Sequence, residues 1–222
     1  MVFDSVAYKN VVSNGLVLDK NGQKMSKRLG NATDPFETLD TYGADATRWY
    51  MIMNANPWDN LKFDLQDLDD VKRRFFSTLH NTYSFFSLYA NIDQFDYTAP
   101  PVPFAARPDI DRWMLSRLQS LTQTVTEAYE AYSPTQAARV IQDFVVDDLS
   151  NWYVRLNRRR FWKGEMSQDK LAAYQTLQQC LSSVAILMAS FSPFYADRLY
   201  RDLMGSEESV HWADFPKVDA EA

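Results

Sequence analysis

The sequence predicts a mainly α-helical protein, in which a helical bundle follows a small α+β segment. Three observations support this fold class. Only 6 of the 222 residues are glycine, which disfavours an all-β architecture with many turns. From residue 65 onward, apolar residues recur at spacings of three and four, the pattern of an amphipathic helix. The first 60 or so residues lack that pattern and carry β-prone stretches separated by turn residues.

The first part of the chain is predicted to contain short strands. Residues 10–12 and 16–18 are rich in β-prone side chains, and the Asn14-Gly15 pair between them is a turn signal. We therefore expect two short strands here, followed by a second turn over residues 19–22.

Two helices are predicted next. Asp34 can accept hydrogen bonds as an N-cap, and Pro35 suits the first helical position. Gly43 should end this helix, and a further helix should run over residues 44–53. Residues 54–63, which include a proline, should form a connector.

The remaining chain is predicted to form a bundle of antiparallel helices. Four prolines in residues 93–108 mark an extended connection between the first of these helices and the second. The predicted bundle helices span residues 65–90, 109–129, 134–162, 167–188 and 193–204.

The chain divides into three predicted parts: the end of one domain in residues 1–63, an α-helical domain in residues 64–206 and an acidic tail in residues 207–222. The net charge of −6 at first sight disfavours a nucleic-acid partner. However, residues 151–163 hold five basic side chains and no acidic one. Such a patch can bind a polyanion on an acidic protein, because salt confines each electric field to about 10 Å.

Composition excludes several function classes. The single cysteine, Cys180, excludes an intrachain disulfide framework, and with only two histidines beside it no metal site is predicted. The longest strongly apolar stretch, residues 181–195, is too short to span a bilayer. The N-terminus lacks a charged region followed by an apolar run, so we predict no signal peptide and expect a cytoplasmic protein.

A short basic loop is the first candidate site. The pentapeptide Lys-Met-Ser-Lys-Arg occupies residues 24–28, between two glycines. Ammonium groups supply compact charge, and backbone amides freed by a turn add hydrogen-bond donors. Lys24 and Lys27 could therefore stabilise the charge that grows on nucleotide phosphates in a transition state. The alternative is a solvated turn that happens to be basic.

Several short motifs accompany this loop: Asn14-Gly15-Leu16-Val17-Leu18-Asp19 before it, Leu29-Gly30-Asn31 after it, then Asp34-Pro35 and Tyr42-Gly43-Ala44-Asp45-Ala46. With them the chain resembles the class I aminoacyl-tRNA synthetases, whose signature loop is Lys-Met-Ser-Lys-Ser. Here Arg28 replaces the final serine, so no hydroxyl is available at that position. Residues 56–64 and 81–86 look like the isoleucyl member of the group, and the resemblance runs from about residue 9 to residue 203.

The resemblance implies a reaction and its site residues. ATP and isoleucine would give isoleucyl-adenylate and pyrophosphate, and the acyl group would then pass to the 3′ end of a tRNA. Lys27 would be the main ATP contact and Lys24 a second phosphate contact, while Ser26 would tune the loop by hydrogen bonding or serve only as a cap. Mg²⁺ would accompany the ATP. No segment resembles an inserted editing domain, and a C-terminal fragment of this kind is expected to be monomeric and inactive by itself.

The second candidate site is a basic, aromatic helix. On a helix, Asn151, Arg155, Arg158 or Arg159, and Trp162 fall along one face at spacings of three and four. Arginine forks hold phosphates, a tryptophan face stacks an unpaired base, and an amide reads a base edge. Unpaired loop bases are the usual target of sequence-specific RNA recognition, so this face suits an anticodon loop. The resemblance implies that Asn151 and Trp162 approach the anticodon.

Other interpretations of this helix stay open. Trp152 is included among the predicted tRNA contacts, although Trp152, Tyr153, Leu156 and Phe161 could all be core residues instead. Two aspartates just before the helix could pair with its arginines, since charge runs are usually solvated faces.

Three alternatives to an isoleucyl enzyme remain. A valyl, leucyl or methionyl synthetase would share the class motifs, because most amino-acid recognition lies outside these residues. A non-catalytic tRNA-binding module would carry a vestigial lysine loop. A purely structural helical bundle would have no RNA partner.

Overall fold

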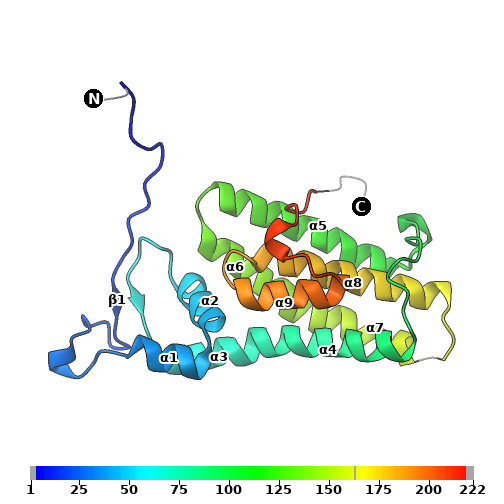
Figure 1. Ribbon diagram of the computed structural model, residues 1–222, viewed down its shortest axis with the longest axis horizontal. Coiled ribbons are helices and arrows are strands. Elements are labelled where there is room, and N and C mark those ends of the chain that lie inside the picture. The colour runs from blue at the N-terminus through cyan, green and yellow to red at the C-terminus, as the bar shows by residue number, and fades with distance from the viewer. Residues whose placement is uncertain (1–3, 163, 219–222) are drawn as a thin grey trace.

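A two-stranded parallel sheet lies at the N-terminal end of the computed structural model, which describes residues 4–162 and 164–218 (Figure 1). Strand β1 (Val17–Leu18) pairs with β2 (Leu61–Lys62). The prediction of a strand at residues 10–12 is wrong, since these residues are exposed and form no part of the sheet.

The reason is a long-range contact at Gly15. Its amide donates to the carbonyl of Pro57 at 2.8 Å, and the amide of Leu16 donates to Asn60 Oδ1 at 2.8 Å. These bonds align β1 with β2, so the strand partner of residues 16–18 is a distant segment and not residues 10–12. A Cβ at Gly15 would lie 2.1 Å from the carbonyl oxygen of Asp59, so only glycine permits this approach.

Two helices complete the N-terminal lobe, which we define as residues 4–64. Helices α1 (Pro35–Tyr42) and α2 (Ala44–Asn54) confirm the predictions for this region. Asp34 caps α1, its carboxylate accepting hydrogen bonds from two amides of the first turn. Gly43, with φ of +86°, separates the two helices in a conformation that favours glycine.

The rest of the described chain is the predicted helical bundle (Figure 1). Its α-helices are α3 (Leu65–Val71), α4 (Ser77–Ile92), α5 (Asp109–Glu130), α6 (Pro134–Asp143), α7 (Arg155–Trp162), α8 (Gln168–Met188) and α9 (Pro193–Met204). The short 3₁₀ turns η3 (Phe104–Ala106) and η5 (Val210–Trp212) lie in this part of the chain, whereas η1 (Lys27–Leu29) lies in the N-terminal lobe. Each predicted bundle helix is confirmed.

Two of the predicted bundle helices, residues 65–90 and 134–162, contain π-helical stretches that the sequence pattern did not predict. Stretch η2 (Lys72–Phe76) joins α3 to α4, and η4 (Phe144–Val154) joins α6 to α7. A π turn closes with i→i+5 hydrogen bonds, so side chains around it depart from the directions that α-helical spacing predicts. Asn151 lies inside η4, so its face relative to α7 cannot be derived from three- and four-residue spacing alone.

The core of the bundle surrounds α8, which contacts α4, α5, α6, α7 and α9. Twelve of its 21 residues are buried, among them Cys180, as predicted. Burial raises the pKa of the Cys180 thiol, which therefore acts as a small packing group. Among the helices of the described residues, none is both long and apolar enough to cross a membrane.

Helix α2 attaches the N-terminal lobe to the bundle. Thr135 Oγ1 donates to the carbonyl of Ile52 at 2.7 Å, and Arg139 Nε donates to the carbonyl of Met53 at 3.0 Å. Both donors lie on α6 and both acceptors in the last turns of α2, where backbone carbonyls lack partners within the helix. The lobe is thus held in a fixed orientation on the bundle.

Candidate functional site

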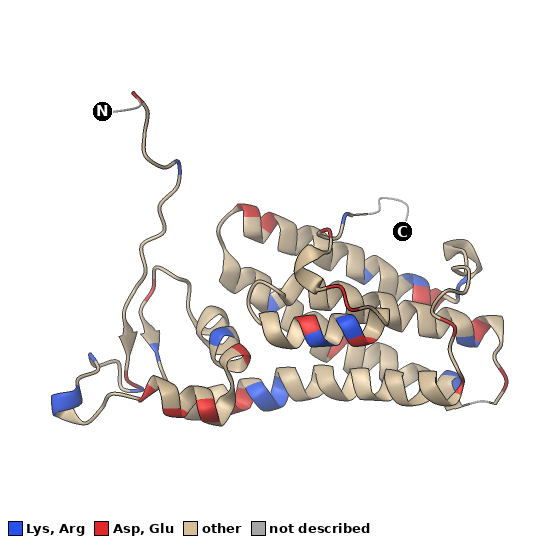
Figure 2. Ribbon diagram, in the orientation of Figure 1, with Lys and Arg blue, Asp and Glu red and all other residues tan. Residues whose placement is uncertain are grey.

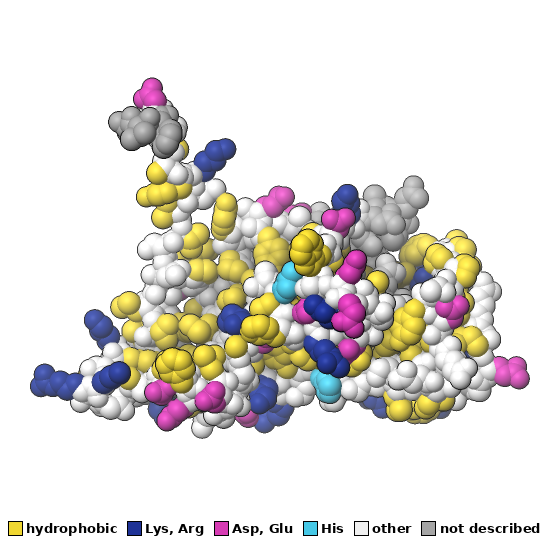
Figure 3. Space-filling view, in the orientation of Figure 1, with side chains coloured by type: hydrophobic (Ala, Val, Ile, Leu, Met, Phe, Trp, Pro, Cys, Tyr) yellow, Lys and Arg dark blue, Asp and Glu magenta, His cyan; other side chains and the backbone are white. Residues whose placement is uncertain are grey.

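The lysine loop, residues 22–30, projects from the free end of the N-terminal lobe (Figure 2). Within the loop, Lys24 forms an isolated β-bridge with Leu18, and residues 27–29 form the turn η1. Lys24, Lys27 and Arg28 are exposed, and Figure 3 shows basic side chains extending from this end of the molecule. No ion pair joins these three cations to the described part of the chain, so they are available to an anionic ligand.

A carboxylate–amide pair that sequence reasoning missed holds the base of the loop. Asp19 Oδ1 accepts hydrogen bonds from the amides of Asn21 and Gln23 at 2.9 and 2.8 Å, and Asp19 Oδ2 accepts one from Asn31 Nδ2 at 2.8 Å. Asn31 Oδ1 in turn accepts a hydrogen bond from the amide of Ser26 at 2.8 Å. The two ends of the loop are therefore tied to each other and to its middle.

These hydrogen bonds favour the ionised form of Asp19. The amide of Gln23, followed by the side chain of Asn31, holds the pKa of Asp19 below its ordinary value. The stabilisation is present above the ordinary aspartate pKa and is lost as pH falls through the lower pKa of the folded state. At neutral pH Asp19 is therefore ionised, and its hydrogen bonds hold the base of the loop. The sequence pattern showed Asp19 only as a turn residue, because its partner is twelve positions away.

Replacing Asp19 with alanine should loosen the loop without unfolding the protein. The amides of Asn21, Gln23 and Ser26 should exchange with solvent about tenfold faster, as expected when hydrogen bonds of ordinary strength are lost. Amide hydrogen exchange read by NMR measures this. Asp96→Ala is the matched control, since Asp96 accepts hydrogen bonds from Thr98 in a turn of the bundle. If these three amides exchanged at the same rate in Asp19→Ala and in Asp96→Ala, a specific role for Asp19 would be contradicted.

The second candidate site is the exposed side of η4 and α7. All six predicted tRNA contacts are exposed: Asn151, Trp152, Arg155, Arg158, Arg159 and Trp162. No hydrogen bond or ion pair joins the guanidinium groups of the three arginines to the residues that the structure describes. Three unpaired cations beside exposed aromatic rings form a surface that suits a single-stranded nucleic acid.

The structure separates the core residues of this helix from the surface residues. Tyr153 and Phe161 are buried, whereas Trp152 and Leu156 are each 54% exposed. The fourth arginine of the run, Arg160, points inward and pairs with aspartates. Asp148, one of the two aspartates before the helix, does not pair with an arginine of α7. Its carboxylate accepts hydrogen bonds from an arginine of α5 instead.

An exposed tryptophan on α5 extends this surface and was missed from the sequence. The rings of Trp113 and Trp152 have centroids 6.5 Å apart, and Trp113 is 36% exposed. In the sequence, Trp113 is one of several apolar residues of its helix, and nothing local marks it as part of a binding surface. Only the packing of α5 against η4 brings the two rings together.

The two candidate sites lie far apart in the structure. The lysine loop is at one end of the long axis, and α7 lies toward the other end of the bundle (Figure 1). A small molecule cannot touch both, whereas a long polyanion could. Within the described residues, no group of three or more histidine, cysteine, aspartate or glutamate side chains is placed to hold a metal ion.

Two protein-family models match the chain. One, described as the anticodon-binding domain of tRNA ligase, covers residues 111–222. The other, described as tRNA synthetases class I (I, L, M and V), covers residues 1–64. The two matches fall on the bundle and the N-terminal lobe.

Curated relatives match along almost the whole chain. The isoleucine–tRNA ligases of Cytophaga hutchinsonii and Bacteroides thetaiotaomicron are each 63% identical, over 99% and 100% of this chain. That of Thermus thermophilus is 51% identical over 99% of the chain. This chain spans 20%, 19% and 21% of these relatives, which is about one fifth of their length.

Solved structures share the fold at low sequence identity. The LeuRS–tRNA–LeuAMS ternary complex of Agrobacterium radiobacter K84 matches with a TM-score of 0.72 and 22% identity, over 94% of this chain and 24% of that chain. Mycobacterium tuberculosis methionyl-tRNA synthetase in complex with methionyl-adenylate matches with a TM-score of 0.67 and 20% identity, over 82% of this chain and 36% of that chain.

Proposed function

Because the chain belongs to the class I tRNA synthetases, with their anticodon-binding domain, we propose that it is part of an isoleucine–tRNA ligase. In that enzyme it supplies the lysine loop and the anticodon-binding bundle. The observation that carries the proposal is the identity of 61–63% to isoleucine–tRNA ligases across nearly the whole chain. The division into parts at residues 63 and 206 stays a prediction.

The proposed reaction is ATP-dependent activation of isoleucine, followed by transfer of the isoleucyl group to tRNA. Lys24 and Lys27 bind the ATP phosphates, where their ammonium groups stabilise charge that grows as the bond to pyrophosphate breaks. Ser26 stands at the N-cap of η1, but its side chain forms no capping hydrogen bond there, so its hydroxyl is available to contact the nucleotide. Mg²⁺ comes with the ATP, whose phosphates supply oxygen ligands of the kind it prefers.

The proposed tRNA contacts run along η4 and α7. Arg155, Arg158 and Arg159 bind phosphates, while Trp152 and Trp162 stack unpaired bases and Asn151 reads a base edge. The separation of this face from the lysine loop supports the proposal, because tRNA is long enough to reach both. A valyl, leucyl or methionyl enzyme would share this arrangement, but the sequence relatives described above are isoleucine ligases.

Replacing Arg158 or Arg159 with alanine should weaken binding of isoleucine tRNA, and the weakening should shrink as salt rises. Each lost phosphate contact should reduce the slope of log affinity against log salt by about one. Filter binding of labelled tRNA over a salt series measures both quantities.

The matched control for this experiment is Arg198→Ala. Arg198 is an exposed arginine on α9, paired with Asp202 at 2.9 Å, and its loss changes the net charge equally. Binding that is insensitive to salt, or an equal loss in the control, would contradict the proposed interface.

A further inference from the structure

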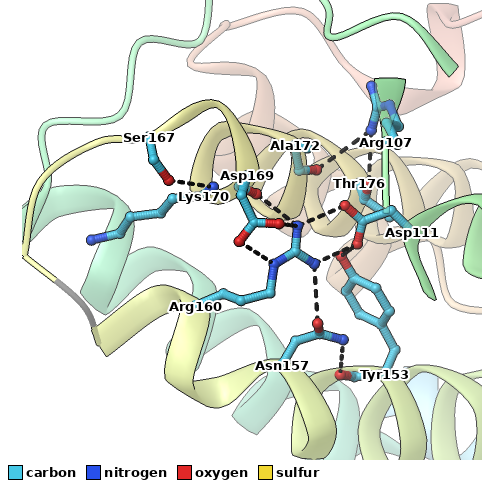
Figure 4. A network of polar contacts seen from close by, with 10 residues as sticks. All are labelled: Arg107, Asp111, Tyr153, Asn157, Arg160, Ser167, Asp169, Lys170, Ala172 and Thr176. Carbon is cyan, nitrogen blue, oxygen red and sulfur yellow. Dashed lines mark hydrogen bonds and ion pairs between the residues drawn. The ribbon is translucent and has the colours of Figure 1, made fainter. Parts of the chain in front are cut away.

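Arg160 differs from every other arginine of the basic helix. Its side chain is only 14% exposed and turns into the bundle (Figure 4). Arg155, Arg158 and Arg159 are exposed to solvent. All three nitrogens of the Arg160 guanidinium are occupied by protein acceptors. Arg160 is therefore withheld from any nucleic acid that binds the exposed face.

The fully buried carboxylate of Asp111 is the main partner of Arg160. Arg160 Nη1 and Nη2 donate to its two oxygens at 2.6 and 2.8 Å, a bidentate arrangement that fixes the plane of the guanidinium. Asp111 also accepts a hydrogen bond from the hydroxyl of Tyr153 at 2.7 Å. Asp111 lies on α5 and Tyr153 on η4, so the network ties α7 to both (Figure 4).

The opposite edge of Arg160 is bound to the first turn of α8. Its Nε donates to Asp169 Oδ2 at 3.0 Å, and its Nη2 donates to the carbonyl of Asp169 at 2.6 Å. Asn157 Oδ1 accepts a further hydrogen bond from Nη1 at 3.0 Å. One guanidinium thus joins α5, α7 and α8 at a point two residues before α7 ends.

We propose that Arg160, Asp111 and Asp169 are positioning residues for tRNA recognition, which hold α7 in the rotation that presents its three exposed arginines and Trp162. The inference rests on the proposed function. The last turn of a helix frays readily, because its carbonyls lack intrahelical partners. Arginine side chains on such a turn lose binding energy when they must be ordered on contact. The Arg160 network orders the turn beforehand and makes no contact with tRNA itself.

Asp169 allows a test in which two explanations predict opposite signs. Its side chain is 53% exposed and carries a negative charge beside a face that would bind a polyanion. If charge alone mattered, Asp169→Asn would strengthen tRNA binding. If Asp169 positions Arg160 and hence α7, the same change weakens binding, although a repulsive charge has been removed.

The experiment measures tRNA affinity of the 222-residue chain at 25 °C, with a thermal unfolding curve for each variant. We expect Asp169→Asn to raise the Kd about three- to tenfold, as for the loss of one or two hydrogen bonds. Asp202→Asn is the control, since it breaks an exposed pair on α9 with the same charge change and should leave the Kd unchanged. Unchanged or tighter binding by Asp169→Asn would overturn the proposal.

A second pair of variants separates positioning from direct contact. Lysine keeps the charge of Arg160 but cannot form the bidentate pair, so Arg160→Lys should lose as much affinity as Arg160→Ala, about tenfold or more. Recovery of wild-type affinity in Arg160→Lys would show a simple charge contact and overturn the proposal.

The unfolding temperature and the steady-state kinetics separate positioning from a purely structural role. A purely structural role would lower the unfolding temperature while leaving the Kd of the folded chain unchanged, which would also overturn the proposal. In the full-length ligase, positioning predicts a raised KM for tRNA with kcat preserved. If the unaltered chain binds no tRNA, the proposed function fails. If it binds and the variants do not differ, the positioning role alone fails.

Discussion

Replacing Lys27 with alanine is expected to slow isoleucine activation by about 10²–10³-fold, the usual cost of removing one group that stabilises transition-state charge. Lys27 is exposed at the start of η1 and has no ion-pair partner among the described residues. Binding to tRNA should be nearly unchanged, because the proposed tRNA contacts lie far from the loop (Figure 1). The rate of isoleucine-dependent pyrophosphate exchange measures the effect.

This measurement requires the proposed full-length ligase, since the 222-residue chain by itself is predicted to be inactive. The matched control is Lys9→Ala, which removes an exposed lysine from the extended segment of the same lobe. A loss smaller than tenfold in Lys27→Ala would contradict its assignment as the main phosphate contact. A larger loss in Lys24→Ala than in Lys27→Ala would reverse the predicted order of the two lysines.

Replacing Trp49 with alanine is expected to destabilise the protein by about 3–5 kcal/mol, the range for large aromatic residues truncated in a core. Trp49 is fully buried on α2 and stacks on Phe75 with ring centroids 4.2 Å apart and an interplanar angle of 13°. Its edge also meets Phe191, in the corner between α8 and α9, at 5.8 Å. The ring therefore joins the N-terminal lobe to two separate parts of the bundle.

The free energy of unfolding in urea measures this effect, and Trp49→Phe sharpens it. The indole Nε1 of Trp49 has no hydrogen-bond partner among the described residues, so phenylalanine sacrifices no hydrogen bond and keeps an aromatic ring. Trp49→Phe should therefore lower the free energy of unfolding clearly less than Trp49→Ala does. Trp212→Ala, at a position that is 88% exposed, should change stability by no more than about 0.5 kcal/mol. Similar losses of unfolding free energy in all three variants would show that Trp49 does not hold the N-terminal lobe to the bundle.

Helices, their capping residues and the basic character of both candidate sites could be read from the sequence. Asp34 caps α1 through hydrogen bonds to amides two and three residues away, and Gly43 ends that helix by its own conformation. Such interactions span a few residues, so a local pattern contains them. The exposure of Arg155, Arg158 and Arg159 on α7 was also predicted, because unpaired cations are almost never buried.

The partner of β1 could not be read in this way. Residues 10–12 have the composition of a strand and stand beside a turn signal, which made a local strand pair the natural prediction. The actual partner lies more than 40 positions away, and Gly15 and Asn60 secure the pairing. Composition indicates whether a segment can form a strand, whereas its strand partner depends on which segments meet when the chain folds.

The sequence by itself determined that this protein is a helical bundle with a basic lysine loop and a basic aromatic helix, because each of these features arises from neighbours along the chain. Only the tertiary structure decided that Asp19 and Asn31 tie the loop, and that Trp113 lies beside Trp152. It also decided that Arg160 turns away from the surface its neighbours form. A buried carboxylate must be paired, and Asp111 on α5 draws Arg160 inward for that reason. Residues 49 positions apart in sequence meet only when their helices pack.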